Sequence, residues 1–331
     1  MSRDSRDMAA RGEIRASRFR PAWWLRNPHL QTLWPTWFRT RPGLRLTAER
    51  VELPDGDFID LAWTDANGGP RVLLLHGLEG SLDSHYARST LAALYGAGMH
   101  AVFMHLRGCS GEPNRLARSY HSGATEDLAA VLAHIERTRG KPPAAAVGFS
   151  LGGNLLLKYL GEQGANAPLK AAVAVSVPFR LMDAARRLEQ GPSRIYREHL
   201  MQRLRGSYLR KFAKRPAPLE VDVRRLHGFY DFDDQVTAPL NGFSGADDYY
   251  DQCSCRRYLR GVETPTLVLH ALDDPFMYPQ TVPTESELGP AIRLELSAKG
   301  GHVGFVEGPI PGKTSYWTDR RIPEFLAGHL A

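Results

Sequence analysis

The chain has 331 residues, of which 43% are hydrophobic, enough for one large α/β domain with an insertion or for two smaller domains. No run of about 20 apolar residues is present, so the sequence predicts no transmembrane helix. The Arg-rich start lacks the apolar core of a secretory signal. Three cysteines without a CxxC pattern fit a reducing compartment, and we expect a cytoplasmic protein.

The net charge of +6 is unevenly distributed along the chain. Residues 1–50 hold eleven arginines and four acidic residues, a balance of +7, which leaves −1 for the remainder. No basic helix and no RNA-binding aromatic motif accompanies this charge. We therefore expect no nucleic-acid partner.

The N-terminal part divides into two segments. Residues 1–20 are polar and charged, and we expect a disordered basic arm there. Residues 21–44 form a Trp-rich segment with four of the six tryptophans, which are Trp23, Trp24, Trp34 and Trp37. This segment either packs on the domain or sits on a lipid surface as an interfacial anchor. The prolines at residues 21, 28 and 35 interrupt a long amphipathic helix, so packing on the protein is favoured and membrane contact is at most peripheral.

Residues 45–331 have the pattern of an α/β domain. Alternating residues at 45–53 and 58–63, joined by a turn, predict an antiparallel hairpin. Continuous apolar runs, typical of strands covered on both faces, then alternate with helical patterns. The predicted strands are residues 72–75, 101–104, 144–148, 169–177, 265–270 and 292–296, and the predicted helices are residues 86–95, 126–137 and 322–330. This order predicts a mostly parallel, doubly wound sheet with an antiparallel N-terminal hairpin.

The strand pattern lapses between residues 178 and 263. This stretch is rich in Arg, Tyr and Asp, with helical segments and few signs of a buried strand. We interpret residues 178–263 as a helical cap inserted above the strand ends.

A Gly-x-Ser-x-Gly turn lies between a small apolar strand and a helix, at Gly148, Ser150 and Gly152. In such an elbow the serine hydroxyl is lifted above the sheet, and small neighbours let strand and helix pack closely. The backbone N–H of Leu151, at the helix start, is then aimed at a substrate oxyanion. A surface loop that matches the pattern by chance is the alternative.

A nucleophilic serine needs a histidine as its base and an acidic residue that orients the histidine. Where the serine lies on such an elbow, the acid comes next along the chain and the histidine follows it. Asp273 and Asp274 come directly after one predicted strand, and His302 follows two glycines after the last strand. We choose Asp274 as the acid because it stands just before a proline loop, three residues after a small residue, and keep Asp273 as the fallback. The loop after the first parallel strand predicts the N–H of Leu78 as the second oxyanion donor.

No set of His, Cys, Asp or Glu has metal-ligand spacing, and no phosphate loop or dinucleotide fingerprint is present. We therefore expect no metal and no cofactor. The pair Cys253 and Cys255 lacks a second pair of ligands, and we interpret it as incidental.

Seven motifs resemble the α/β-hydrolase superfamily and, within it, the YheT-like esterases, which are related to eukaryotic abhydrolase-domain lipases. These motifs lie at residues 26–32, 76–81, 107–114, 148–154, 236–240, 273–276 and 301–305. The resemblance runs from about Trp23 to the C-terminus. It implies a Ser150, Asp274, His302 triad that hydrolyses carboxylic esters with acyl chains of short to medium length.

Other functions use the same residues. An acyltransferase would pass the acyl group to an alcohol, and a binding protein of this fold would keep the pocket without turnover. A lipase or phospholipase would act at a lipid surface. A small-molecule ester or a lipid is the expected substrate in each enzymatic case, and no residue pattern specifies an oligomeric state.

Overall fold

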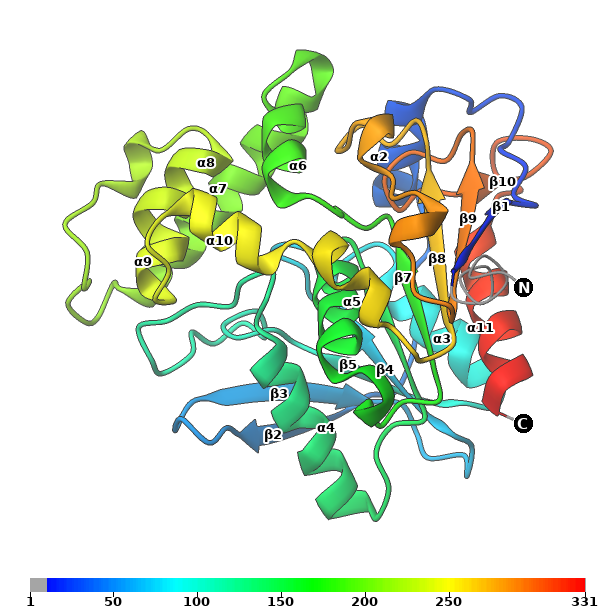
Figure 1. Cartoon of the computed structure of the whole chain (residues 1–331), viewed down its shortest axis with the longest axis horizontal. Helices are drawn as coiled ribbons and strands as arrows, with labels where there is room; N and C mark the ends of the chain where they lie inside the picture. The colour runs from blue at the N-terminus through cyan, green and yellow to red at the C-terminus, as the bar shows by residue number, and fades with distance from the viewer. Residues whose placement is uncertain (1–10, 331) are drawn as a thin grey trace, which may run out of the picture.

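A computed structural model of the protein describes residues 11–330, organised around one nine-stranded sheet (Figure 1). Its strands, in spatial order, are β1 (Glu13–Ala16), β9 (Ile292–Ser297), β8 (Thr266–Ala271), β7 (Ala171–Val175), β6 (Ala145–Phe149), β4 (Arg71–Leu75), β5 (His100–Met104), β3 (Phe58–Trp63) and β2 (Thr47–Glu52). The pairs from β1 to β5 are parallel, whereas β2–β3 and β3–β5 are antiparallel. The predicted hairpin and the mostly parallel sheet are therefore confirmed.

Helices cover both faces of the sheet, which explains why the central strands have apolar runs without alternation. One face packs against α4 (Thr125–Arg139) and α5 (Leu151–Gln163), through residues such as Val131 and Leu155. The other face packs against α3 (Ala87–Gly96) and α11 (Trp317–Leu330), through residues such as Leu91 and Phe325. The last helix begins five residues before its predicted start at residue 322, because it tolerates Pro323 inside its length.

The N-terminal arm differs from its prediction. Residues 1–10 lie outside the described residues, but Glu13–Ala16 form β1, which pairs in parallel with β9. Phe19, also in the predicted disordered arm, is buried against Phe305. The expectation of disorder is wrong for residues 13–19. The polar composition of these residues does not exclude a strand, because an edge strand is held by backbone hydrogen bonds to its neighbour and can expose most of its side chains.

The Trp-rich segment contains α2 (Pro28–Phe38), which begins with Pro28 at a position where no N–H is needed. A small two-stranded ribbon, β10 (Val306–Glu307) with β11 (Ser315–Tyr316), lies against it. Ala22 and Leu25 are buried in this contact, while Trp23 and Trp37 are exposed. The segment therefore packs on the domain through only part of its apolar surface.

The chain leaves the sheet between β7 and β8. It forms α6 (Leu181–Leu188), α7 (Arg194–Lys211), α8 (Phe229–Phe232), a π-helical turn (Asp233–Thr237), α9 (Ala238–Leu240) and α10 (Ala246–Cys253). These helices share a hydrophobic cluster of their own and lie at the upper left of Figure 1, so we call residues 178–253 the cap. The next segment, Cys255–Gly261, is a 3-10 helix whose Cys255 and Leu259 join the core around α5. The last part of the predicted insertion thus belongs to the body.

Among residues 11–330, every helix is too short or too polar to cross a lipid bilayer.

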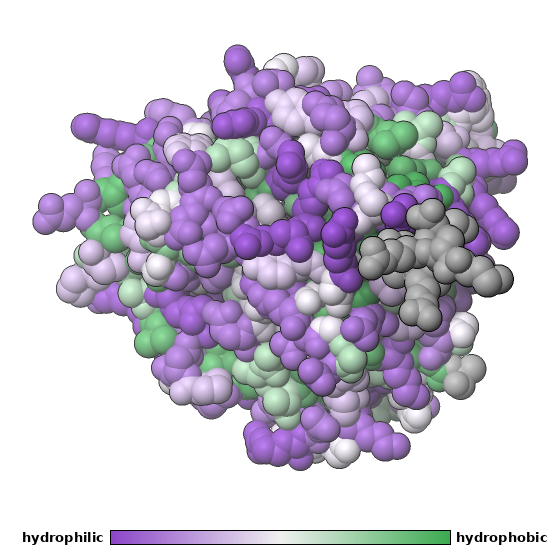
Figure 2. Space-filling model, in the orientation of Figure 1, coloured by the Kyte–Doolittle hydropathy of each residue, from purple (hydrophilic) through white to green (hydrophobic). Residues whose placement is uncertain are grey.

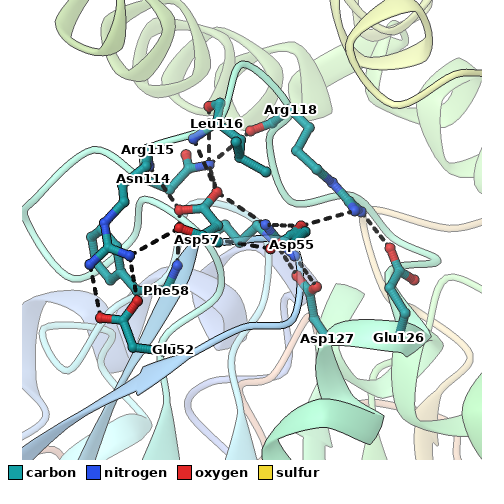
Figure 3. A network of polar contacts seen from close by, with 12 residues as sticks. Glu52, Asp55, Asp57, Phe58, Asn114, Arg115, Leu116, Arg118, Glu126 and Asp127 are labelled. Atoms are coloured by element: carbon teal, nitrogen blue, oxygen red, sulfur yellow. Dashed lines mark hydrogen bonds and ion pairs between the residues drawn. The ribbon is translucent and has the colours of Figure 1, made fainter.

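A buried ionic network joins the hairpin turn, the loop after β5 and α4 (Figure 3). Arg107 is 4% exposed, and its guanidinium donates two hydrogen bonds to the Asp127 carboxylate at 2.6 and 2.7 Å. It also donates to Asp57 at 3.0 Å and pairs with Asp55 at 2.8 Å. Burial alone would raise the pKa of Asp57, but hydrogen bonds, first among them one from Asn114, lower it. The network fixes the loop after β5, which lines a cavity beneath the cap with residues such as Cys109 and Ser110.

We expect Arg107→Met to lower the free energy of unfolding by about 3–5 kcal/mol, because it leaves two buried carboxylates without their cation. Urea denaturation measures this loss. Arg115→Met is the matched control, since Arg115 pairs with the exposed Glu52 and its loss should cost far less. Equal effects of the two substitutions would contradict the assignment.

Candidate active site

Ser150 lies at the turn between β6 and α5, with φ 51° and ψ −117°. A positive φ is strained for a serine, and the strain persists only where neighbouring structure fixes it. The N–H of Ser150 donates to the Val175 carbonyl at 2.8 Å, and its own carbonyl accepts from Asn154 at 3.0 Å. The hydroxyl therefore stands at the carboxyl end of the central strand.

The glycines around Ser150 allow strand and helix to touch. A methyl group on Gly148 would lie 2.4 Å from the Gly152 carbonyl oxygen. One on Gly152 would lie 2.5 Å from the His76 carbonyl oxygen and 2.7 Å from that of Leu75. Neither position has room for a side chain, so the elbow depends on both glycines.

His302 is brought to Ser150 by the turn after β9. Its Nε2 lies 3.0 Å from the Ser150 Oγ, and its Nδ1 lies 2.8 Å from the Asp274 Oδ2. Asp274 is 3% exposed, and its other oxygen accepts from the Phe276 N–H. The three predicted residues thus form one line of hydrogen bonds, Asp274 to His302 to Ser150.

Asp273, the fallback, points elsewhere. Its Oδ1 accepts the N–H of Gly301 at 3.1 Å, and its Oδ2 lies 3.9 Å from the Lys299 ammonium. It therefore contacts the turn that carries His302 and makes no hydrogen bond to the imidazole.

The backbone N–H groups of Leu78 and Leu151 form no hydrogen bond within residues 11–330, and both residues line the cavity with Ser150. The orientation of the Leu78 N–H follows from His76. The N–H of Leu106 donates to the His76 Nε2 at 3.0 Å, so the ring proton lies on Nδ1 and donates to the Gly77 carbonyl at 2.7 Å. Because the peptide is trans, holding that carbonyl turns the Leu78 N–H the opposite way.

His76 remains neutral in this arrangement. It is completely buried, and burial lowers its pKa to about 3. Its neighbour in the loop, Glu79, also has a positive φ, 52°. The N–H of Glu79 donates to the Tyr120 hydroxyl at 2.7 Å, and that hydroxyl donates to the Glu79 carboxylate at 2.9 Å. The other carboxylate oxygen accepts from Ser207 of the cap at 2.6 Å, so the loop that contains Leu78 and Glu79 is tied to α7.

The site opens into a cavity of about 690 Å³ between the sheet and the cap. Cavities of this size hold drug-sized ligands. Ser150, His302 and Leu151 contribute from the body, and much of the cap side is apolar, with Leu181, Leu188, Leu200, Phe229 and Phe232.

Several residues that support the site were not predicted from the sequence. Thr32 of α2 accepts the His302 N–H at 2.9 Å, and Phe276 stacks on the His302 ring with centroids 3.9 Å apart. Asn154 donates to the Cys253 carbonyl and accepts the Cys255 N–H, which fixes the end of the cap to α5. Their place in the sequence could have identified these residues, because Thr32, Asn154 and Phe276 all lie inside motifs that carry the family resemblance.

Comparison with known proteins identifies the family of the chain. The family model described as "alpha/beta hydrolase fold" matches residues 70–309. The chain belongs to the α/β-hydrolase family. "Putative esterase YheT" of Escherichia coli is 43% identical over 311 residues, which cover 92% of this chain and 91% of that protein.

Two further matches are proteins named as a phospholipase and as an esterase. Mouse "Phospholipase ABHD3" is 32% identical over 92% of this chain and 77% of its own length. The solved structure of the Pyrococcus furiosus esterase Pf2001 shares the fold, with a TM-score of 0.55 at 17% identity, and the match covers 96% of this chain and all of that one.

The elbow yields a stability test. We expect Gly152→Ala to lower the free energy of unfolding by about 3 kcal/mol or more, because the methyl group would collide with backbone. Gly96→Ala, at an exposed helical position with no atom within 4 Å of the added carbon, should instead stabilise the α/β-hydrolase by up to about 1 kcal/mol. Urea titrations of both variants measure these changes in the free energy of unfolding. An unchanged unfolding midpoint for Gly152→Ala would show that position 152 has room for a methyl group.

Proposed function

We propose that this α/β-hydrolase cleaves carboxylic esters through an acyl-enzyme on Ser150. The observation that carries the proposal is the line of hydrogen bonds from Asp274 through His302 to Ser150, at 2.8 and 3.0 Å, which opens into the cavity. A serine is a weak nucleophile until a base takes its proton, and a buried carboxylate orients that base.

In the proposed reaction, His302 Nε2 takes the hydroxyl proton while Ser150 Oγ forms a bond to the ester carbonyl carbon. The N–H groups of Leu78 and Leu151 stabilise the negative oxygen of the tetrahedral intermediate. His302 then gives the proton to the leaving alkoxide, the ester C–O bond breaks, and the alcohol departs. Water repeats the sequence on the acyl-enzyme, releases the carboxylic acid and restores Ser150.

The cavity supports a substrate larger than a simple acetate. Its volume and the apolar cap residues fit an acyl chain of short to medium length, in a small-molecule ester or a lipid. Relatives named as an esterase and as a phospholipase support the same class. The three free cysteines fit the cytoplasmic location expected from the sequence.

The two neighbouring carboxylates give a matched pair of variants. We expect Asp274→Asn to lower kcat for a p-nitrophenyl ester by about three to four orders of magnitude, because an amide no longer fixes the His302 tautomer. Asp273→Asn keeps an acceptor for the Gly301 N–H and should change kcat by less than about tenfold. If Asp273→Asn were the more damaging change, the assignment of the acid would be wrong.

A covalent probe tests the nucleophile. Fluorophosphonate should label the wild-type chain and not Ser150→Ala, whose ester hydrolysis should fall by about four orders of magnitude or more. Adding ethanol to an acyl-chain series of p-nitrophenyl esters separates hydrolysis from acyl transfer. Acid as the main product supports the proposal, whereas ethyl ester as the main product would favour an acyltransferase. Labelling that survives in Ser150→Ala would exclude this serine.

A further inference from the structure

Helix α2 leaves much of its apolar face exposed, although Leu33 packs against the cap and Trp34 packs against Trp24. Leu30, Leu33, Trp34, Trp37 and Phe38 share one face of the helix, because their spacing follows the helical repeat. The opposite face is the buried one, and it is mostly polar. Gln31 and Thr32 lie against the domain with Pro35, and Arg39 pairs there with Asp319. An amphipathic helix of a globular protein normally has the reverse orientation.

The contacts of the buried face prevent α2 from rotating its apolar face inward. Gln31 is completely buried, and its side-chain amide donates to the Leu25 and Val306 carbonyls and accepts the Val306 N–H. A methyl group on Gly301 would lie 2.6 Å from the Pro28 carbonyl oxygen, which shows how closely α2 lies against the turn of His302. The orientation is therefore built into the fold.

The apolar side chains that remain exposed lie on α2, on the segment just before it, and on the loop between β10 and β11. Trp37 and Phe38 are 59% and 57% exposed, and Leu30 is 44% exposed. Trp23 is 66% exposed and donates through its indole to Pro309, beside Ile310, which is 48% exposed. We call these five residues the aromatic surface. Figure 2 shows hydrophobic residues gathered at the upper right, where Figure 1 places α2.

Positive charge adjoins the aromatic surface. Arg18, Arg20 and Arg26 precede α2 in the chain and are exposed, and none of them forms an ion pair with any residue of 11–330. Exposed tryptophans beside unpaired arginines match the interface of an anionic bilayer, where indole rings lie at the headgroup level and arginines contact phosphate.

We propose that the aromatic surface binds an anionic lipid bilayer. The inference concerns where the α/β-hydrolase works and does not rest on which ester it cleaves. Since α2 also holds the N–H of His302 through Thr32, the bound bilayer lies beside the element that supports the active site.

The test is flotation of the full chain with vesicles. We expect binding to vesicles of equal parts phosphatidylglycerol and phosphatidylcholine, with weaker binding to phosphatidylcholine alone and at high salt. Trp37→Ser with Phe38→Ser should weaken binding by about tenfold or more, because two aromatic side chains no longer enter the interface. Leu30→Ser, on the same surface, should weaken it less.

Tyr95→Ser with Tyr230→Ser is the matched control, since both tyrosines are exposed on other elements and should leave vesicle binding unchanged. Hydrolysis of a soluble p-nitrophenyl acetate by every variant, within about twofold of wild type, shows that folding and the active site are intact. Three results would overturn the proposal: no wild-type binding, binding unaffected by the Trp37 and Phe38 substitutions, or a dimer in sedimentation velocity that those substitutions dissociate.

Discussion

The proposed active site depends on the strained backbone of Ser150. A left-handed conformation at a serine costs about 1–3 kcal/mol, and here three contacts hold it. Its N–H is bound by the neighbouring strand β7, its carbonyl is bound by the first turn of α5, and Gly152 lets that helix touch the end of β4. The close-packed sheet supplies the rigidity that a loop alone could not, and it determines where the hydroxyl points.

The turn that carries His302 is held by the same physical means but from different parts of the chain. Val303 and Phe305 have φ values of 56° and 44°, again unusual for residues with side chains. Thr32, more than 250 residues away in sequence, accepts the His302 N–H, and Ser176 accepts that of Val303. The imidazole is thus aligned by α2 and by the end of β7, and the Ser150 and His302 turns meet because both rest on β7.

The sequence predicted the parts of this arrangement that local chemistry decides. Apolar runs identified the parallel strands, and the order of Ser150, Asp274 and His302 along the chain placed them at strand ends, where the structure brings them together. It did not predict β1, whose pairing depends on free backbone groups of β9. The sequence also did not predict the residues that hold the site in place, because Thr32, Tyr120 and Asn154 act through contacts between segments far apart in sequence.

Helix α2 shows why its orientation could not be read from its own pattern. Hydrophobic periodicity alone predicts that the face with Trp37 and Phe38 is buried, and the prolines at residues 21, 28 and 35 argue against a long helix. The site imposes the opposite orientation, because the loop of His302 needs an acceptor for its N–H and Val306 needs both a donor and an acceptor. Thr32 and Gln31 satisfy these groups only when the polar face points inward. The exposed aromatic surface is therefore the geometric consequence of holding His302 in place.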